Sequence, residues 1–139
     1  MKRNLARWRT LEARLGREMA IWIVTVRSDG RPHMTPVWYV WLNERIYIAT
    51  GTDTQKFTNL RTNQAVALAL PDTDSVLILE GEAHAADRQT TDKLGEYFFN
   101  KYEWDFRYDE DADWRLVEIT PHRILAWGDG FEHEGIRVW

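Results

Sequence analysis

Short runs of β-branched and aromatic residues, separated by turn-forming residues about every eight to twelve positions, restrict the fold of this chain more than any other feature. Turn chemistry is clearest at Ser28-Asp29-Gly30 and Asn43-Glu44, where the chain can double back. The first three strands are expected to form a meander, and Pro121 should separate the last two at an edge or bulge. The runs predicted as strands are residues 20–26, 33–42, 46–50, 65–70, 76–86, 116–120 and 124–127.

Three segments have the spacing of amphipathic helices, with apolar residues three and four positions apart. The second segment follows Thr52-Asp53-Thr54, whose hydroxyl and carboxylate groups can cap a helix. The predicted helices are residues 4–18, 54–62 and 87–102. Since closing a sheet removes its exposed edges, we expect a mainly β fold, a barrel of six to seven strands that three helices plug or flank.

A chain of 139 residues is long enough for one hydrophobic core and too short for two ordinary domains, so we expect one domain spanning residues 1–139. No stretch approaches the roughly 20 apolar residues that cross a bilayer. Met1-Lys2-Arg3-Asn4 leads into charged sequence instead of an apolar signal core. We therefore expect a cytoplasmic protein with no membrane partner.

Charge and residue content exclude several kinds of chemistry. A net charge of -4 argues against a nucleic-acid partner, and the absence of cysteine excludes disulfides, thiolate ligands and a cysteine nucleophile. His84, His122 and His133 are scattered without the spacing of a zinc site, so no metal is expected. Redox chemistry in such a chain would need an organic cofactor. Its eight tryptophans could fill the core, line an interface or stack on a flat ligand.

The segment from Ile48 to Arg61 has the composition of a phosphate cradle. Gly51 allows a ligand to approach the backbone, Thr52 offers a hydroxyl, and the start of the predicted helix presents unpaired N–H groups. Lys56 adds a charge that a phosphate would neutralise. The same residues also fit an ordinary capped surface helix with a solvated lysine.

Two motifs add weight to the cradle: P-H-x-T-P-V-W at Pro32–Trp38 and K-x-x-N-L-R at Lys56–Arg61, with a predicted strand between them. This order resembles the pyridoxamine 5′-phosphate oxidase-like family of flavin and deazaflavin oxidoreductases, and the resemblance runs from Met19 to Trp127. It implies an FMN-binding split β-barrel that forms a homodimer with the cofactor at the subunit interface. The implied reaction is hydride transfer to or from a small organic substrate, with FMN as the first choice of cofactor and coenzyme F-420 as the alternative.

The resemblance also implies cofactor-binding residues. Lys56 would pair with the phosphate, although the neutral Gln55 before it departs from the basic or small hydroxyl residue common in the family. Alternation along the strand places His33, Thr35 and Val37 on the face that meets the ribityl chain and the ring. Asn59 could bind the phosphate loop or pack its own helix. The full set of candidate cofactor-binding residues is His33, Thr35, Val37, Thr50, Gly51, Thr52, Gln55, Lys56, Asn59 and Trp127. Trp127, Trp139 and the aromatic run from Tyr97 to Phe106 could stack on the ring from the partner chain, or could simply pack in the core and at the interface.

No catalytic residue can be named, because the cofactor of such an enzyme carries the chemistry. His33 could donate a proton or serve only as a structural hydrogen-bonding group. Arg27, Arg31 and Arg61 could furnish a basic groove for the glutamyl tail of F-420. Pyridoxine 5′-phosphate oxidation is not expected, because residues 128–139 lack the segment rich in Arg and Pro that the true oxidases carry.

Two rival functions stay open. The same barrel could be a non-catalytic carrier or sensor that holds a flavin, a haem or a similar planar ligand without turnover. It could also be an interaction module with an empty cleft, in which the aromatic residues serve only a dimer interface. The acidic run Asp109-Glu110-Asp111 is interpreted as a solvated loop without a function.

Overall fold

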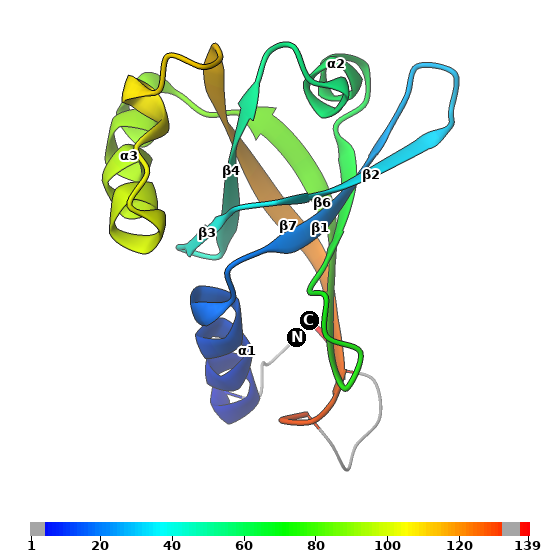
Figure 1. The fold of residues 1–139 in the computed structure, drawn as a ribbon. Helices are drawn as coiled ribbons and strands as arrows, with labels where there is room; N and C mark the ends of the chain where they lie inside the picture. Colours follow the sequence, from blue (N-terminus) through cyan, green and yellow to red (C-terminus); the bar gives the residue numbers. More distant parts are fainter. Residues whose placement is uncertain (1–4, 132–136) are drawn as a thin grey trace.

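The computed structural model describes residues 5–131 and 137–139, within which eight strands and three α-helices are found (Figure 1). Each predicted helix is present, the first from Leu5 because Asn4 lies outside the described residues. The elements are α1 (Leu5–Arg17), β1 (Ile21–Val26), β2 (Pro32–Val37), β3 (Val40–Leu42), β4 (Arg45–Gly51), α2 (Gln55–Thr62), β5 (Ala65–Ala69), β6 (Ser75–Ala85), α3 (Arg88–Tyr102), the 3-10 turn η1 (Phe106–Tyr108), β7 (Trp114–Gly128) and β8 (Arg137–Val138).

The strands form one antiparallel sheet in the order β2-β1-β5-β6-β7-β4-β3, and β8 pairs with β7. The edge strands β2 and β3 are separated along the chain only by Trp38 and Tyr39. The sheet must therefore curl until its two edges approach each other, which gives a barrel that is split along β2 (Figure 1). This confirms the mainly β fold expected from the sequence.

The predicted run 33–42 is two strands, β2 and β3, so the middle strand of the predicted meander is divided between the two edges of the sheet. The chain leaves the ladder at Tyr39, whose backbone N–H donates to Tyr102 Oη at 3.0 Å. That break carries the chain from one edge of the sheet to the other. The two hairpins β1–β2 and β3–β4 form as expected, but β1 has β5 as its second neighbour and β4 has β7.

The two strands predicted on either side of Pro121 are one continuous strand, β7. Glu80 pairs with Arg123 while Gly81 pairs with Pro121, so β7 has one more residue than β6 at this point. This additional residue forms a β-bulge, as Pro121 predicted. A Cβ on Gly81 would lie 2.2 Å from the carbonyl oxygen of Thr120. Only glycine therefore allows the close approach at which the two long strands continue past the proline.

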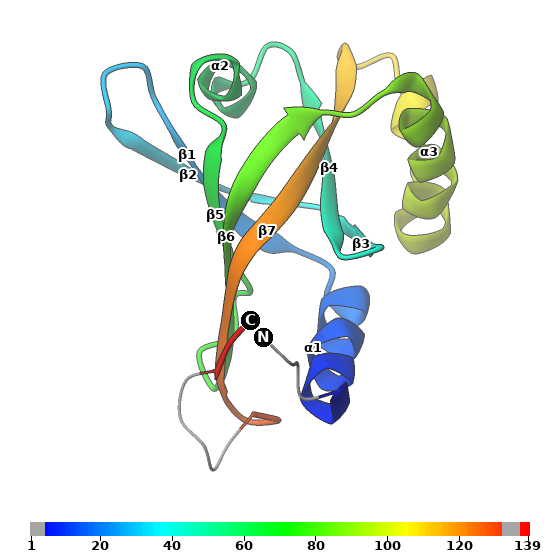
Figure 2. The ribbon, with the colours of Figure 1, turned by 180° about the vertical axis from the view of Figure 1, so that it is seen from behind.

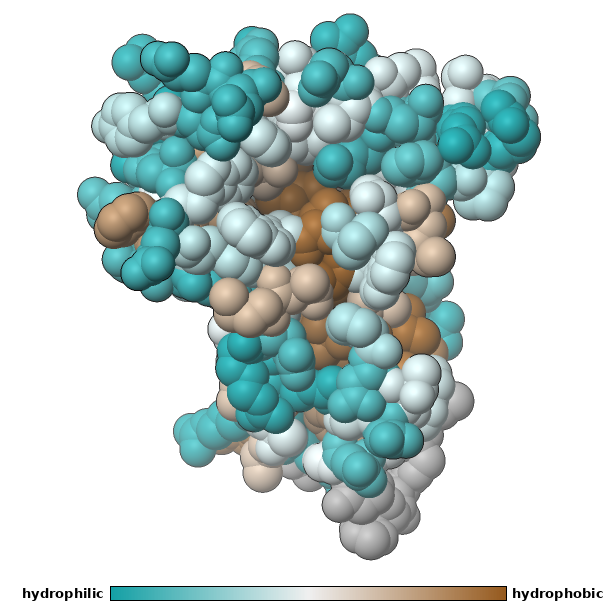
Figure 3. Space-filling model, viewed as in Figure 1, coloured by the Kyte–Doolittle hydropathy of each residue, from teal (hydrophilic) through white to brown (hydrophobic). Residues whose placement is uncertain are grey.

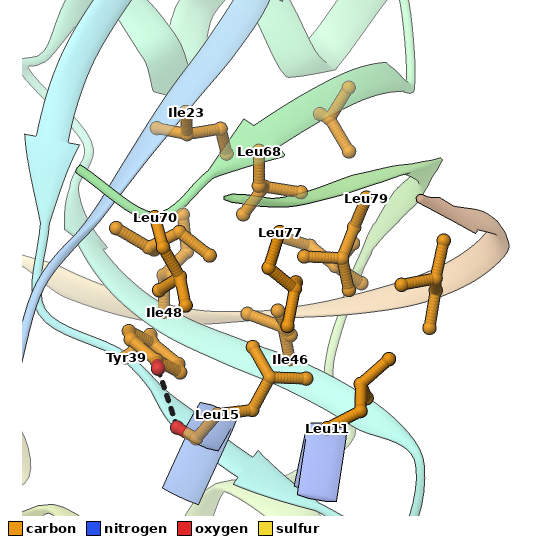
Figure 4. Packing of buried hydrophobic residues seen from close by; sticks show 14 of the residues in the cluster. Leu11, Leu15, Ile23, Tyr39, Ile46, Ile48, Leu68, Leu70, Leu77 and Leu79 are labelled. Carbon is orange, nitrogen blue, oxygen red and sulfur yellow. Dashed lines mark hydrogen bonds between the residues drawn. The ribbon is translucent and has the colours of Figure 1, made fainter. Parts of the chain in front are cut away.

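The barrel interior is filled by leucine and isoleucine side chains from most of the strands, joined by the inner face of α1 (Figure 4). Leu11 and Leu15 of α1 are fully buried there. Tyr39 closes this side of the core, and its hydroxyl donates to the carbonyl oxygen of Leu15 (Figure 4). Helix α1 therefore seals one end of the barrel.

A second cluster lies outside the barrel, where Leu94 and Phe98 of α3 pack on Tyr47 and Leu116 of the sheet. Helix α2 lies over the other end of the barrel from α1, and Figure 2 shows that none of the described helices covers the outer face of β5, β6 and β7. Among residues 5–131 and 137–139, no helix combines the length and the apolar character needed to span a bilayer.

Candidate functional site

The loop between β4 and α2 is held by its own hydroxyl groups. Thr54 is the N-cap of α2, as the sequence predicted: its Oγ1 accepts the N–H of Phe57 at 3.3 Å and donates to the Gly51 carbonyl at 2.8 Å. The buried Thr50 Oγ1 lies 2.9 Å from Thr54 Oγ1. Both hydroxyls are thus used to hold the conformation of the loop.

The backbone of this segment retains free donors. Thr52 N–H is bonded to the Asp113 carbonyl at 3.0 Å, whereas the N–H groups of Gln55 and Lys56 have no acceptor among the described residues. The first N–H groups of a helix lack partners within the helix and carry a partial positive charge. The start of α2 therefore suits an anion, and phosphate is the anion for which this geometry is commonly used.

Lys56 is half-buried on the first turn of α2. Burial lowers the pKa of its ammonium group from the ordinary value, and the nearby Asp53 carboxylate partly opposes that shift. No hydrogen bond or ion pair satisfies its Nζ within the part of the chain that the structure describes. A half-buried cation without a bonded partner is costly, and an anionic ligand would offset that cost.

Asn59 of the predicted site faces inward, and the exposed Gln55 bonds to it. Asn59 is 1% exposed, and its amide donates to Thr25 Oγ1 of β1 at 2.9 Å. Gln55 Nε2 donates to Asn59 Oδ1 at 2.8 Å. These bonds fasten α2 to β1, so the packing interpretation of Asn59 is seen directly, while cofactor contacts of Gln55 and Asn59 stay predictions.

Along β2, His33, Thr35 and Val37 alternate with exposed residues and form a half-buried face, as the strand period predicted. His33 Nδ1 is buried and has no hydrogen-bond partner within residues 5–131 and 137–139. Buried polar atoms are rarely left unpaired in proteins, so this nitrogen fits a site that expects a donor or an acceptor from a ligand. In the β1–β2 register His33 lies opposite Thr25, and Thr25 accepts a hydrogen bond from α2. The half-buried face of β2 therefore lies next to the helix that carries Lys56.

A hollow of about 310 Å³ lies between the strand ends at the split of the barrel. Val37 of β2 and Ala49 of β4 contribute to it, and Figure 3 shows apolar residues at the bottom of a hollow in this face of the molecule. We call it the ring chamber, and it is lined by Val37, Trp38, Ala49, Trp104, Asp109 and Trp114.

Three residues of the ring chamber, Trp104, Asp109 and Trp114, follow α3 in the sequence. Trp104 and Trp114 meet edge to face with ring centroids 4.9 Å apart, and Trp104 Nε1 donates to Asp109 Oδ2 at 2.7 Å. The pKa of the Asp109 carboxyl lies below its usual value, because it accepts hydrogen bonds from the backbone N–H of Asp111 and from this indole. The chamber thus has aromatic walls and one ionised edge.

Trp127 does not meet the other predicted residues within one chain. It pairs with Val76 at the far end of β7, thirteen positions from Trp114, which pairs with Gly51. At about 3.3 Å per residue this separation is about 43 Å along an extended strand. Trp139, the other tryptophan considered for stacking, packs near Trp8 and Phe131 on the core. Within one chain Trp127 therefore lies far from the ring chamber, and its stacking from a partner chain stays a prediction.

Two of the three arginines proposed for a basic groove are engaged in the β1–β2 turn. Arg31 Nε lies 2.7 Å from Asp29 Oδ2, and Arg27 Nη1 donates to the Pro32 carbonyl at 3.0 Å. Arg61 stands apart on α2, with its guanidinium over the Phe57 ring. Among the described side chains no metal-binding cluster of His, Asp or Glu is found, and His133 lies outside them.

Comparisons with known proteins bear on the family and the fold. A family model described as pyridoxamine 5′-phosphate oxidase matches residues 8–128. A search of curated proteins found no sequence match. Solved structures with the same fold include an F-420 reductase, 24% identical, covering 81% of this chain and 94% of its own, with a TM-score of 0.68.

Two further structures extend the comparison. A putative pyridoxamine 5′-phosphate oxidase from Listeria innocua is 15% identical and covers 91% of this chain and 100% of its own, with a TM-score of 0.71. A heme binding protein from Mycobacterium smegmatis is 13% identical, with a TM-score of 0.77, and the match covers 100% of this chain and 59% of that one. At these identities the similarity establishes the fold.

Proposed function

Because the chain belongs to the pyridoxamine 5′-phosphate oxidase-like family, we propose that it binds FMN and transfers a hydride to or from a small organic substrate. The observation that carries this proposal is the half-buried Lys56, whose ammonium has no bonded partner among the described residues and lies on the first turn of α2. A phosphate at this point would receive the charge of Lys56 and the free N–H groups of the helix start.

The remaining parts of FMN have suitable neighbours. The ribityl chain carries hydroxyl groups, and the unpaired Nδ1 of His33 on the β2 face could bond to one of them. Val37 and Ala49 give the ring chamber an apolar side, and Trp104 and Trp114 offer aromatic faces for a flat ring. Bound there, the flavin would supply the electron-carrying chemistry, and the protein would bind and orient it. Thr35, Thr50, Gly51 and Thr52 complete the proposed contacts.

We also propose that two copies pair through the uncovered face of the sheet. Register places Pro36, Trp22, Ala69, Ile78 and Leu125 side by side across five strands, all on the outer face. Trp22 is 36% exposed and the neighbouring Met34 is 61% exposed. An apolar face of this extent is typical of a protein interface.

FMN remains the first choice over F-420. The glutamyl tail of F-420 favours an open groove with free cations, whereas Arg27 and Arg31 are held within their own turn. Because an F-420 reductase is among the similar structures, F-420 is included as the alternative cofactor in the assay below.

A carrier or sensor of haem is the second candidate. The similarity to a heme binding protein supports it, as does an imidazole, that of His33, on the face beside the ring chamber. A haem carrier needs no electron donor or substrate, so the two functions differ in an assay of turnover.

The test is steady-state turnover of the FMN-loaded protein with reduced nicotinamide as donor and a panel of quinones and aldehydes as acceptors. The same panel is run with reduced F-420, and a parallel titration with haem is followed by its absorption band. Turnover that requires bound FMN supports the oxidoreductase. Saturable haem uptake without turnover under any donor would replace it by the carrier.

A further inference from the structure

A second hollow, larger than the ring chamber, lies on the other side of Trp114. It has a volume of about 460 Å³, within the range of roughly 300–1,000 Å³ found for small-molecule sites. Residues of α2, of the end of β6, of the start of β7 and of the first turn of α3 surround it, and Figure 2 shows these strand ends between the two helices. We call it the α2–α3 groove. Neither Lys56 nor any residue of β2 lines it.

Three alanines at and just after the end of β6 help to keep the groove open, and His84 among them also lines it. Ala83, Ala85 and Ala86 lie opposite Phe57 and Leu60 of α2 and leave space that larger residues would fill. The walls of the groove suit a hydrocarbon or aromatic group.

The rim of the groove is cationic. Arg61 of α2, Arg88 of α3 and Arg115 of β7 all line it, whereas no acidic side chain does among the residues described. Arg115 is bonded to Asp113 at 3.1 Å, but no acceptor is found for Arg88 within residues 5–131 and 137–139. Three arginines around one apolar space stand out on a chain with a net charge of -4.

We propose that the α2–α3 groove is a second ligand site, which takes a small amphipathic carboxylate. The apolar part would lie against Leu60, Ala83 and Val117, and the carboxylate would meet the arginine rim. The planar guanidinium group matches a carboxylate with two parallel hydrogen bonds, which an uncharged ligand of the same length would not form. This site is separate from the proposed flavin site and does not depend on it.

The test is calorimetric titration of the FMN-saturated full chain with decanoate, and with 1-decanol as the uncharged probe. Decanoate should bind and be weakened at least about tenfold by Arg88→Gln, whereas Arg9→Gln, at an exposed arginine of α1, should have no effect. Ala85→Trp should abolish binding by filling the groove, with folding checked by circular dichroism. Lys56→Ala should leave decanoate affinity unchanged.

Several results would overturn the proposal. Equal affinity for decanoate and decanol would show that the arginine rim does not bind the carboxylate. An unchanged decanoate affinity in Arg88→Gln would lead to the same conclusion. Competition between decanoate and FMN would place the fatty acid in the cofactor site instead. If FMN does not bind at all, the titration is run on the free protein, so failure of the flavin proposal is distinguishable from failure of this one.

Discussion

Replacing Lys56 with alanine should weaken FMN binding by removing the cation that faces the phosphate. A hydrogen bond to a charged group contributes about 1.5–3 kcal/mol, which corresponds to roughly 10- to 150-fold in Kd. The structure favours the upper part of this range. The preceding residue, Gln55, is neutral and bonds to Asn59, so it does not compensate for the lost charge.

The assay is quenching of flavin fluorescence, measured with FMN and with riboflavin, which lacks the phosphate. Lys56→Ala should weaken FMN by the stated factor and leave riboflavin unchanged, while Lys56→Arg should retain most of the affinity. Lys93→Ala removes an exposed lysine of α3 and serves as the matched control. Equal FMN affinity in Lys56→Ala and Lys93→Ala, or an equal loss for riboflavin, would refute the phosphate assignment.

Three further changes test the fold, one titration and the proposed interface. Gly81→Ala should lower the free energy of unfolding by about 1–3 kcal/mol, because the added Cβ would clash with the backbone. Gly16→Ala has open space around it and should raise the free energy of unfolding by about 0.5–1 kcal/mol. Urea denaturation measures both changes. Burial lowers the pKa of Lys101 from 10.5 to about 8. Between pH 8 and 10.5 the unfolded chain therefore binds more protons than the folded one, so the stability of the fold should rise with pH in this range. The variant Lys101→Met should lack that rise. Ile78→Glu should convert a dimer to a monomer in sedimentation, while Leu5→Glu, exposed on α1, should not; a monomeric wild type would end the dimer proposal.

Features set by near neighbours in the sequence were predictable. Asn43 and Glu44 both have positive φ angles, of 50° and 60°, as the tight turn of a hairpin requires, and Gly30 has a φ of 89°. Asp87 caps α3 by accepting the N–H of Thr90 at 2.7 Å. Each depends on a few consecutive residues, so the sequence reports it directly.

Strand pairing was harder to predict from the sequence, because it is determined by contacts between segments that are far apart in the chain. Nothing near Tyr39 in the sequence shows that its backbone bonds to Tyr102, and this bond is what divides the predicted strand. The continuity of β7 past Pro121 depends on Gly81, forty positions earlier. A proline alone predicts a bulge or a break equally well.

The sequence motifs on β2, β4 and α2 predicted the residues that these elements contribute to the candidate site. They did not predict the residues that follow α3. Trp104, Asp109 and Trp114 reach the ring chamber only because α3 packs on the sheet and returns the chain to the split of the barrel. Their one sequence signal is the density of tryptophan and aspartate after α3, which also fits a solvated loop. The inward bonds of Asn59 could likewise be seen only in three dimensions.

The most direct measurement of the central claim is an absorption spectrum and mass analysis of the purified full chain, before and after titration with FMN and with F-420. We expect saturable uptake of FMN with a shift in the ring absorption band, because the flavin leaves water for an aromatic chamber. Uptake of F-420 alone would move the proposal to the deazaflavin. Failure of both to bind would contradict the account and leave Lys56 and the ring chamber without the ligand proposed for them.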